Sequence, residues 1–113
     1  MSDIEEEQEQ YIKMMNELLL SRNTVCLKNL IVAYRTCVSN LIQEAYYAYM
    51  KIYDTFIEND ELRCVSLSAI YEVYTPLTGE LRSWIKERID NASESCKWYF
   101  NEILCRESAL GIR

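Results

Sequence analysis

Apolar side chains recur along much of the chain with the period of an α-helix. The clearest case lies between Thr24 and Glu58, where apolar or aromatic residues follow one another at steps of three or four. The average step is about 3.6 residues, the period of an amphipathic helix and not of a strand. We call these positions the core stripe: Ile31, Tyr34, Val38, Leu41, Ala45, Tyr49, Ile52 and Phe56. The pattern predicts one uninterrupted helix over 24–58, and a charge at Leu41, in mid-stripe, should be severely destabilising.

Similar but weaker patterns predict three further helices over 3–20, 60–74 and 76–107. The first 75 residues contain neither glycine nor proline, which favours long helices. We expect the last helix to be continuous. The alternative is a division at Asp90 and Asn91, because Asn91 and Glu94 have the spacing of a capping box.

Polar residues at the expected helix starts agree with these limits. Asn23 or Thr24 can cap the helix over 24–58, and Asn59 or Asp60 can cap the next one. Thr75 can cap the last helix, since the proline that follows it suits a first helical position. The fold class is therefore all-α, with a single domain over 1–113 and an acidic N-terminal helix within 1–20.

The length of the second helix suggests that more than one copy of the chain is needed. A helix over 24–58 would be about 52 Å long at 1.5 Å per residue. A compact domain of this size is only about 35 Å across. We therefore expect an elongated antiparallel bundle of about four helices, completed by homodimerisation.

Aromatic residues between 45 and 53 support the same expectation. Tyrosine buries a large ring while its hydroxyl stays near water, and it is common at interfaces. The candidate interface comprises Tyr46, Tyr47, Met50 and Tyr53. The alternative, of equal weight, is that these side chains cover the core of one copy.

Composition removes most familiar enzyme classes. The chain has no histidine, so it lacks the commonest general base and transition-metal ligand. Its two glycines, Gly79 and Gly111, are isolated, so no glycine-rich phosphate loop occurs. We predict no catalytic residue, no cofactor and no metal, and thus not an enzyme.

Charge is concentrated at one end of the chain. The net charge is −6, and residues 1–17 hold six acidic residues against one lysine, a local sum of −5. The remainder is close to neutral and lacks the basic field that binds nucleic acids. A weak phosphate-facing patch could form from Arg82, Lys86 and Lys97 on one side of the last helix, although a solvated face is the ordinary interpretation.

Five cysteines are spread along the chain without a Cys-x-x-Cys pair, which makes zinc binding a poor fit. We expect reduced thiols that pack as small apolar side chains. The alternative is an intracellular disulfide of the type found in hyperthermophiles and their viruses. The acidic N-terminus predicts no signal peptide, and no apolar run is long enough for a membrane span, so we expect an intracellular protein, cytoplasmic or nuclear.

These features favour a non-enzymatic module for protein–protein interaction and oligomerisation through apolar, tyrosine-rich helix faces. Its partners would be a second copy and another protein. The alternative is a small acidic inhibitor, such as a viral anti-defence protein, that blocks a basic site on a larger machine. A weak nucleic-acid binder is the second alternative, and membrane binding is not expected.

Overall fold

The computed structural model describes residues 3–36, 38–73 and 77–109, with side chains over 5–36, 38–73 and 77–106. These residues are almost entirely helical, as the sequence predicts. The helices are α1 (Asp3–Leu20), α2 (Thr24–Tyr34), α3 (Ile42–Thr55), α4 (Asp60–Glu72), α5 (Gly79–Arg88), the 3-10 turn η1 (Ile89–Asn91) and α6 (Glu94–Ala109).

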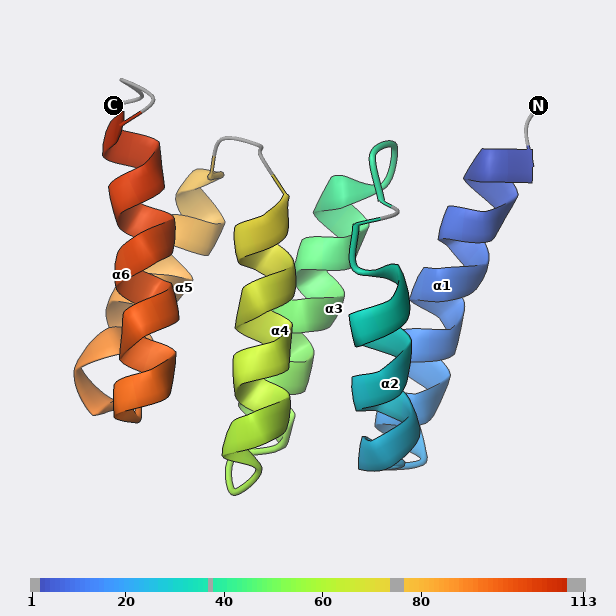
Figure 1. Ribbon diagram of the computed structural model, residues 1–113, viewed down its shortest axis with the longest axis horizontal. Coiled ribbons are helices and arrows are strands. Elements are labelled where there is room, and N and C mark those ends of the chain that lie inside the picture. Colours follow the sequence, from blue (N-terminus) through green and yellow to red (C-terminus); the bar gives the residue numbers. More distant parts are fainter. Residues whose placement is uncertain (1–2, 37, 74–76, 110–113) are drawn as a thin grey trace.

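Successive helices run up and down and form two layers (Figure 1). In Figure 1, α2, α4 and α6 lie in the nearer layer, and α1, α3 and α5 lie behind them. Helices of one layer are therefore parallel to one another and begin at the same end of the molecule. The shortest dimension is 20 Å, which is the thickness of two layers of helices.

The expected helix over 24–58 is wrong, because the chain turns back between α2 and α3. The buried amide of Gln8 stabilises this turn from α1. Its Oε1 accepts a hydrogen bond from the backbone N–H of Asn40 at 2.9 Å, and its Nε2 donates to Ser39 Oγ at 3.3 Å. Thr36, Ser39 and Asn40 are all poor helix formers, which lowers the cost of the interruption.

The expected continuity of the last helix is also wrong. The segment over 76–107 divides into α5, η1 and α6, and α6 runs back alongside α4. The cap of α6 is Ser93, whose Oγ accepts the backbone N–H of Cys96 at 3.2 Å. The alternative division is therefore nearer the structure, but the capping residue is Ser93 and not Asn91.

Other helix limits follow the local signals. Asn23 caps α2 and Asn59 caps α4, each accepting a backbone N–H with its side-chain oxygen. Helix α5 begins at Gly79 with Thr78 as its cap, and the proposed cap Thr75 lies outside the described residues. Arg22, at φ 58°, takes the left-handed position just beyond α1 that ends many helices.

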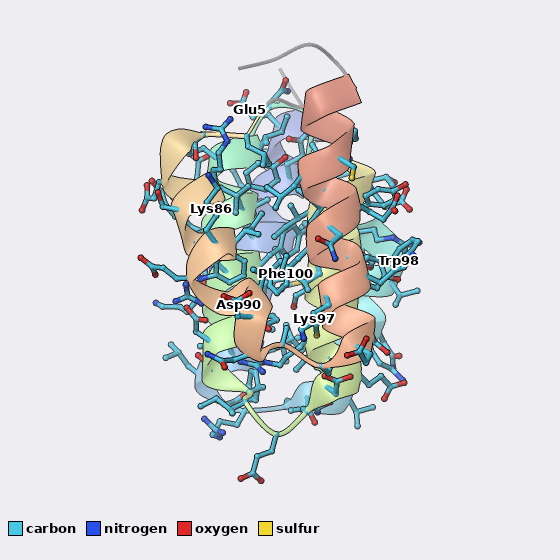
Figure 2. The ribbon with its side chains drawn as sticks, turned by 90° about the vertical axis from the view of Figure 1, so that its left-hand side faces the viewer. Glu5, Lys86, Asp90, Lys97, Trp98 and Phe100 are labelled. Carbon is cyan, nitrogen blue, oxygen red and sulfur yellow. The ribbon has the colours of Figure 1, made fainter. Side chains whose placement is uncertain are left out.

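Most of the core stripe is buried despite the turn. Ile31, Val38, Ala45, Tyr49, Ile52 and Phe56 lie in one continuous cluster of apolar side chains. Tyr34 is an error of the prediction, since 51% of it is exposed, and Leu41 is only half-buried at the start of α3. In Figure 2, Phe100 of α6 points between the two layers, where it meets the rings of Tyr53 and Trp84.

The molecule is a slab of 35 × 34 × 20 Å and is not elongated. The longest helix over the described residues, α1, has 18 residues and so spans about 27 Å, which fits within the slab. The length argument for a homodimer therefore fails, because the 52 Å rod on which it depended does not form. None of the helices over the described residues combines the length and apolar composition that a membrane crossing needs.

Candidate functional site

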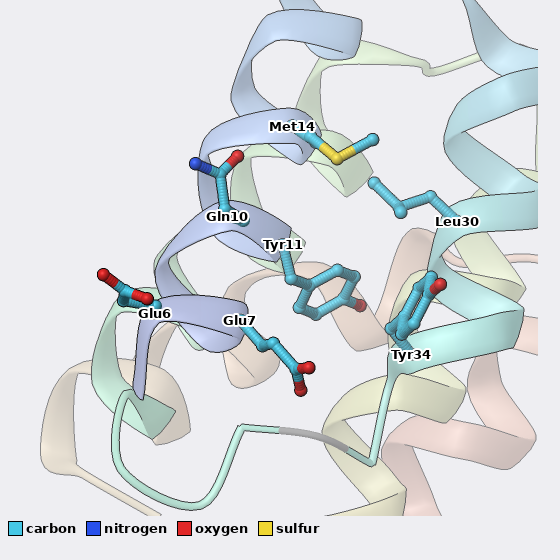
Figure 3. Close-up of a pocket in the computed structure, with 7 residues that line it drawn as sticks. All are labelled: Glu6, Glu7, Gln10, Tyr11, Met14, Leu30 and Tyr34. Atoms are coloured by element: carbon cyan, nitrogen blue, oxygen red, sulfur yellow. The ribbon is translucent and has the colours of Figure 1, made fainter. Parts of the chain in front are cut away.

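An open groove of about 620 Å³ lies between α1 and α2. We call it the α1/α2 groove, and Figure 3 shows its lining residues from both helices: Glu6, Glu7, Gln10, Tyr11, Met14, Leu30 and Tyr34. The α1–α2 pair forms one end of the two-layer array, so this groove belongs to a terminal unit (Figure 1).

The floor of the groove is apolar and partly exposed. Met14 is 43% exposed and Tyr34 is 51% exposed, and in Figure 3 Met14 and Leu30 face each other across the groove. The rings of Tyr11 and Tyr34 lie 6.1 Å apart between their centroids. Exposed apolar surface in a concave site is typical of surfaces that bind another molecule.

One side of the groove is acidic. Glu6 and Glu7 line it from α1, and Glu5 and Glu9 of the same helix are also exposed. Among the described residues of α1, Lys13 is the cation, so the carboxylates of this helix outnumber its positive charge. A ligand for this groove should therefore combine apolar surface with positive charge.

Hydrogen bonds to the core hold α1 in position beneath the groove. The hydroxyl of Tyr11 bonds to that of Tyr49 at 2.8 Å inside the protein, which joins α1 to α3. Gln8, one turn away, joins α1 to the turn before α3. The groove is thus built on a fixed support, which reduces the entropy lost on binding.

A second candidate site is a group of sulfur and carboxylate atoms between α4 and α6. We call it the thiol cluster; it comprises Asp60, Cys64 and Cys96. The two Sγ atoms are 3.8 Å apart, and the Asp60 carboxylate lies 3.5 Å from Cys96 Sγ and 3.8 Å from Cys64 Sγ. Cys96 is buried, Cys64 is half-buried and Asp60 is exposed.

Both thiols of this cluster hold their protons tightly. Burial raises the pKa of Cys64 to about 12, and the neighbouring Cys96 and Asp60 add to the rise. Burial likewise raises the pKa of Cys96. Because the thiolate is the reactive form, neither cysteine is an activated nucleophile near neutral pH.

The predicted tyrosine interface does not form a single surface. Tyr46 is 3% exposed and Tyr53 is 1% exposed, so both belong to the core of one copy, and Met50 is half-buried. Tyr47 is at the surface, but its hydroxyl donates to Glu80 Oε1 of α5 at 2.8 Å. For Tyr46 and Tyr53, the structure therefore agrees with the alternative interpretation, in which these side chains belong to the core of one copy.

The predicted phosphate-facing patch is divided by the break before α6. Arg82 and Lys86 lie on α5, whereas Lys97 lies on α6, which runs in the opposite direction. Figure 2 shows Lys86 and Lys97 apart on the two helices. Lys97 Nζ is 4.0 Å from Glu94 Oε2, so part of its charge is offset locally.

The sequence predicts neither the α1/α2 groove nor the thiol cluster as a site. The spacing of Asp60 and Cys64, one helical turn apart, could have suggested a shared face, but Cys96 is distant in the chain. Cys26 and Cys105 are exposed free thiols, and Cys37 lies outside the described residues.

Comparison with known protein families, curated proteins and solved structures finds no match, so the function rests on the chemistry of the chain's own residues.

Proposed function

We propose that this protein is a protein-binding module whose α1/α2 groove accepts an amphipathic helix of another protein. The occupant carries apolar residues on one face and Lys or Arg along the edge of that face. The observation that carries the proposal is the combination, in one groove, of a partly exposed apolar floor and an acidic side.

The apolar floor supports a helix as the occupant. Two neighbouring helices leave a furrow along their axes, and a third helix can place its side chains at i, i+3, i+4 and i+7 into such a furrow. Met14, Leu30 and Tyr34 offer a Met-containing, adaptable apolar surface of this type. Binding would continue the array of helices by one more member at its end.

The acidic side supports a basic occupant. Charges at the edge of an interface chiefly speed association and select the partner, and their effect falls as salt rises. Glu6 and Glu7 lie where Lys or Arg beside the apolar face of a docked helix would meet them. A helix edged with Glu would be repelled by the same carboxylates.

The experiment uses fluorescently labelled model helices and measures their binding by anisotropy. One peptide has a leucine face edged with lysine, the second has the same face edged with glutamate, and the third scrambles the first. The lysine-edged peptide should bind best, and added salt should weaken it. Met14→Gln should weaken it about three- to tenfold, because the peptide covers the 43% of this side chain that is exposed, and full burial of a methionine is worth about 1.5 to 3 kcal/mol.

A matched control is Val32→Gln, an exposed apolar residue of α2 outside the groove lining, which should leave binding unchanged. Equal binding of the three peptides, or an equal loss in both variants, would contradict the proposal. So would preferential binding of a single-stranded oligonucleotide. A particle of twice 13.4 kDa that Met14→Gln reduces to a monomer would instead make a second copy the occupant.

A further inference from the structure

We propose that the thiol cluster is a binding site for a thiophilic divalent metal ion such as Zn²⁺. Asp60, Cys64 and Cys96 would supply three ligands, and water the fourth. The site lies between α4 and α6, away from the α1/α2 groove, and does not depend on the proposed function.

Two of the three ligand spacings agree with a tetrahedral ion, and the third, Cys64 Sγ to the other Asp60 oxygen at 3.8 Å, is about 0.3 Å longer than the tetrahedral distance. With Zn–S bonds of about 2.3 Å and Zn–O bonds of about 2.0 Å, a tetrahedral angle places two sulfurs about 3.8 Å apart and sulfur and oxygen about 3.5 Å apart. The two Sγ atoms are 3.8 Å apart, and Cys96 Sγ is 3.5 Å from an Asp60 oxygen. The ligand atoms of all three residues lie within 4.8 Å of one another.

The fold holds the three residues near the N-terminal ends of two parallel helices. Asp60 opens α4 with Cys64 one turn later, and Cys96 lies in the first turn of α6. The caps Asn59 and Ser93 bond to backbone N–H groups of these turns, which fixes the backbone that carries the ligands. Burial keeps both thiols protonated in the free protein, so an ion that binds here displaces their protons, and the helix N-termini offset part of that cost because they favour negative charge.

The cluster reaches the surface through Asp60. Asp60 is exposed while Cys96 is buried, so an ion can enter from solvent and still be partly enclosed. Thiolate sulfur selects soft or borderline ions such as Zn²⁺ over Mg²⁺ or Ca²⁺. A disulfide between the same cysteines would use the sulfurs but give no role to the carboxylate beside them, which is why the geometry favours a metal.

The test is a titration of the reduced full-length protein with Co²⁺ alone, under argon and with a non-thiol reductant. Binding should produce thiolate-to-cobalt charge-transfer absorption and the visible bands of tetrahedral Co²⁺, with saturation at one equivalent. Zn²⁺ should abolish both signals by displacement. Cys64→Ser should remove the charge-transfer signal or reduce affinity more than about tenfold, the loss that even outer-shell partners can produce.

The paired controls are Cys26→Ser and Cys105→Ser, which change exposed thiols elsewhere and should leave the titration unchanged. Asp60→Asn alters an exposed ligand with little risk to the fold, and should weaken cobalt binding by a similar factor. The proposal is overturned if the parent gives no charge-transfer band, or if the band survives unchanged in folded Cys64→Ser or Asp60→Asn. It is also overturned if the cysteine pair only oxidises to a disulfide and binds no cobalt when reduced.

Discussion

The buried amide of Gln8 should be the largest single polar contribution to the turn between α2 and α3. Gln8 is 2% exposed and bonds to both Ser39 and Asn40. Gln8→Ala removes two hydrogen bonds, each worth a net of about 0.5 to 1.5 kcal/mol, and leaves the Asn40 N–H without its acceptor. We therefore expect the free energy of unfolding to fall by about 1 to 3 kcal/mol.

Urea unfolding followed by circular dichroism measures this loss. With a urea m-value of about 2 kcal/mol/M, a loss near 2 kcal/mol lowers the midpoint by about 1 M. The matched control is Gln10→Ala, the same change at an exposed position of α1, which should stay within about 0.5 kcal/mol of the parent. Amide exchange at Asn40 should also accelerate in Gln8→Ala. Equal midpoints for the two variants, with unchanged exchange at Asn40, would refute the role assigned to this amide.

Two further predictions concern pH and the start of α3. Burial raises the pKa of Tyr53 to about 12 from an ordinary 10.0, so the folded state keeps the phenol proton longer than the unfolded state does. The contribution of this phenol to the free energy of unfolding is complete below about pH 10 and is lost as pH rises toward 12. Tyr53→Phe should therefore reduce the fall in melting temperature between pH 10 and 12. The surface change Tyr47→Phe should leave that fall unchanged. The apolar period predicts a severe loss for a charge at Leu41, and the structure corrects this expectation. Leu41 is half-buried at the cap of α3, where an aspartate can accept a helix N–H, so Leu41→Asp should cost only about 1 kcal/mol in urea unfolding. Val38→Asp, a charge at a position that is 1% exposed in the same turn, should cost more than about 3 kcal/mol or prevent folding, and equal losses for the two would contradict this assignment.

Local signals in the sequence predict the local parts of this fold. The limits of α1, the caps Asn23 and Asn59 and most of the core stripe follow from helical periodicity and from side chains that satisfy backbone groups nearby. Each of these features depends on residues within about one or two turns. That is the range over which sequence patterns report structure most directly.

The apolar periodicity does not reveal the turn between α2 and α3, because the length of that turn keeps the pattern in phase. Seven residues, 35–41, separate the two helices, which is close to two full turns at 3.6 residues each. The apolar period therefore continues across the turn with almost no change of phase, although the backbone reverses. The poor helix formers Thr36, Ser39 and Asn40 were the available warning, but the contact that stabilises the turn comes from Gln8, about 30 residues earlier.

Both candidate sites exist because of the two interruptions that the periodicity does not reveal. In a continuous helix over 24–58, the residues after Tyr34 would extend the core stripe along the same rod. Because the chain turns back after α2, those residues pack in α3 instead, and Tyr34 is left at the end of α2, where it lines the α1/α2 groove. In a continuous helix over 76–107, Cys96 would lie far along a single rod. Because η1 turns the chain, α6 runs parallel to α4 and its first turn meets that of α4, which brings Cys96 to Cys64. Both candidate sites therefore depend on where the helices end. The residues that end the helices determine the chemistry of these sites as much as the residues that line them.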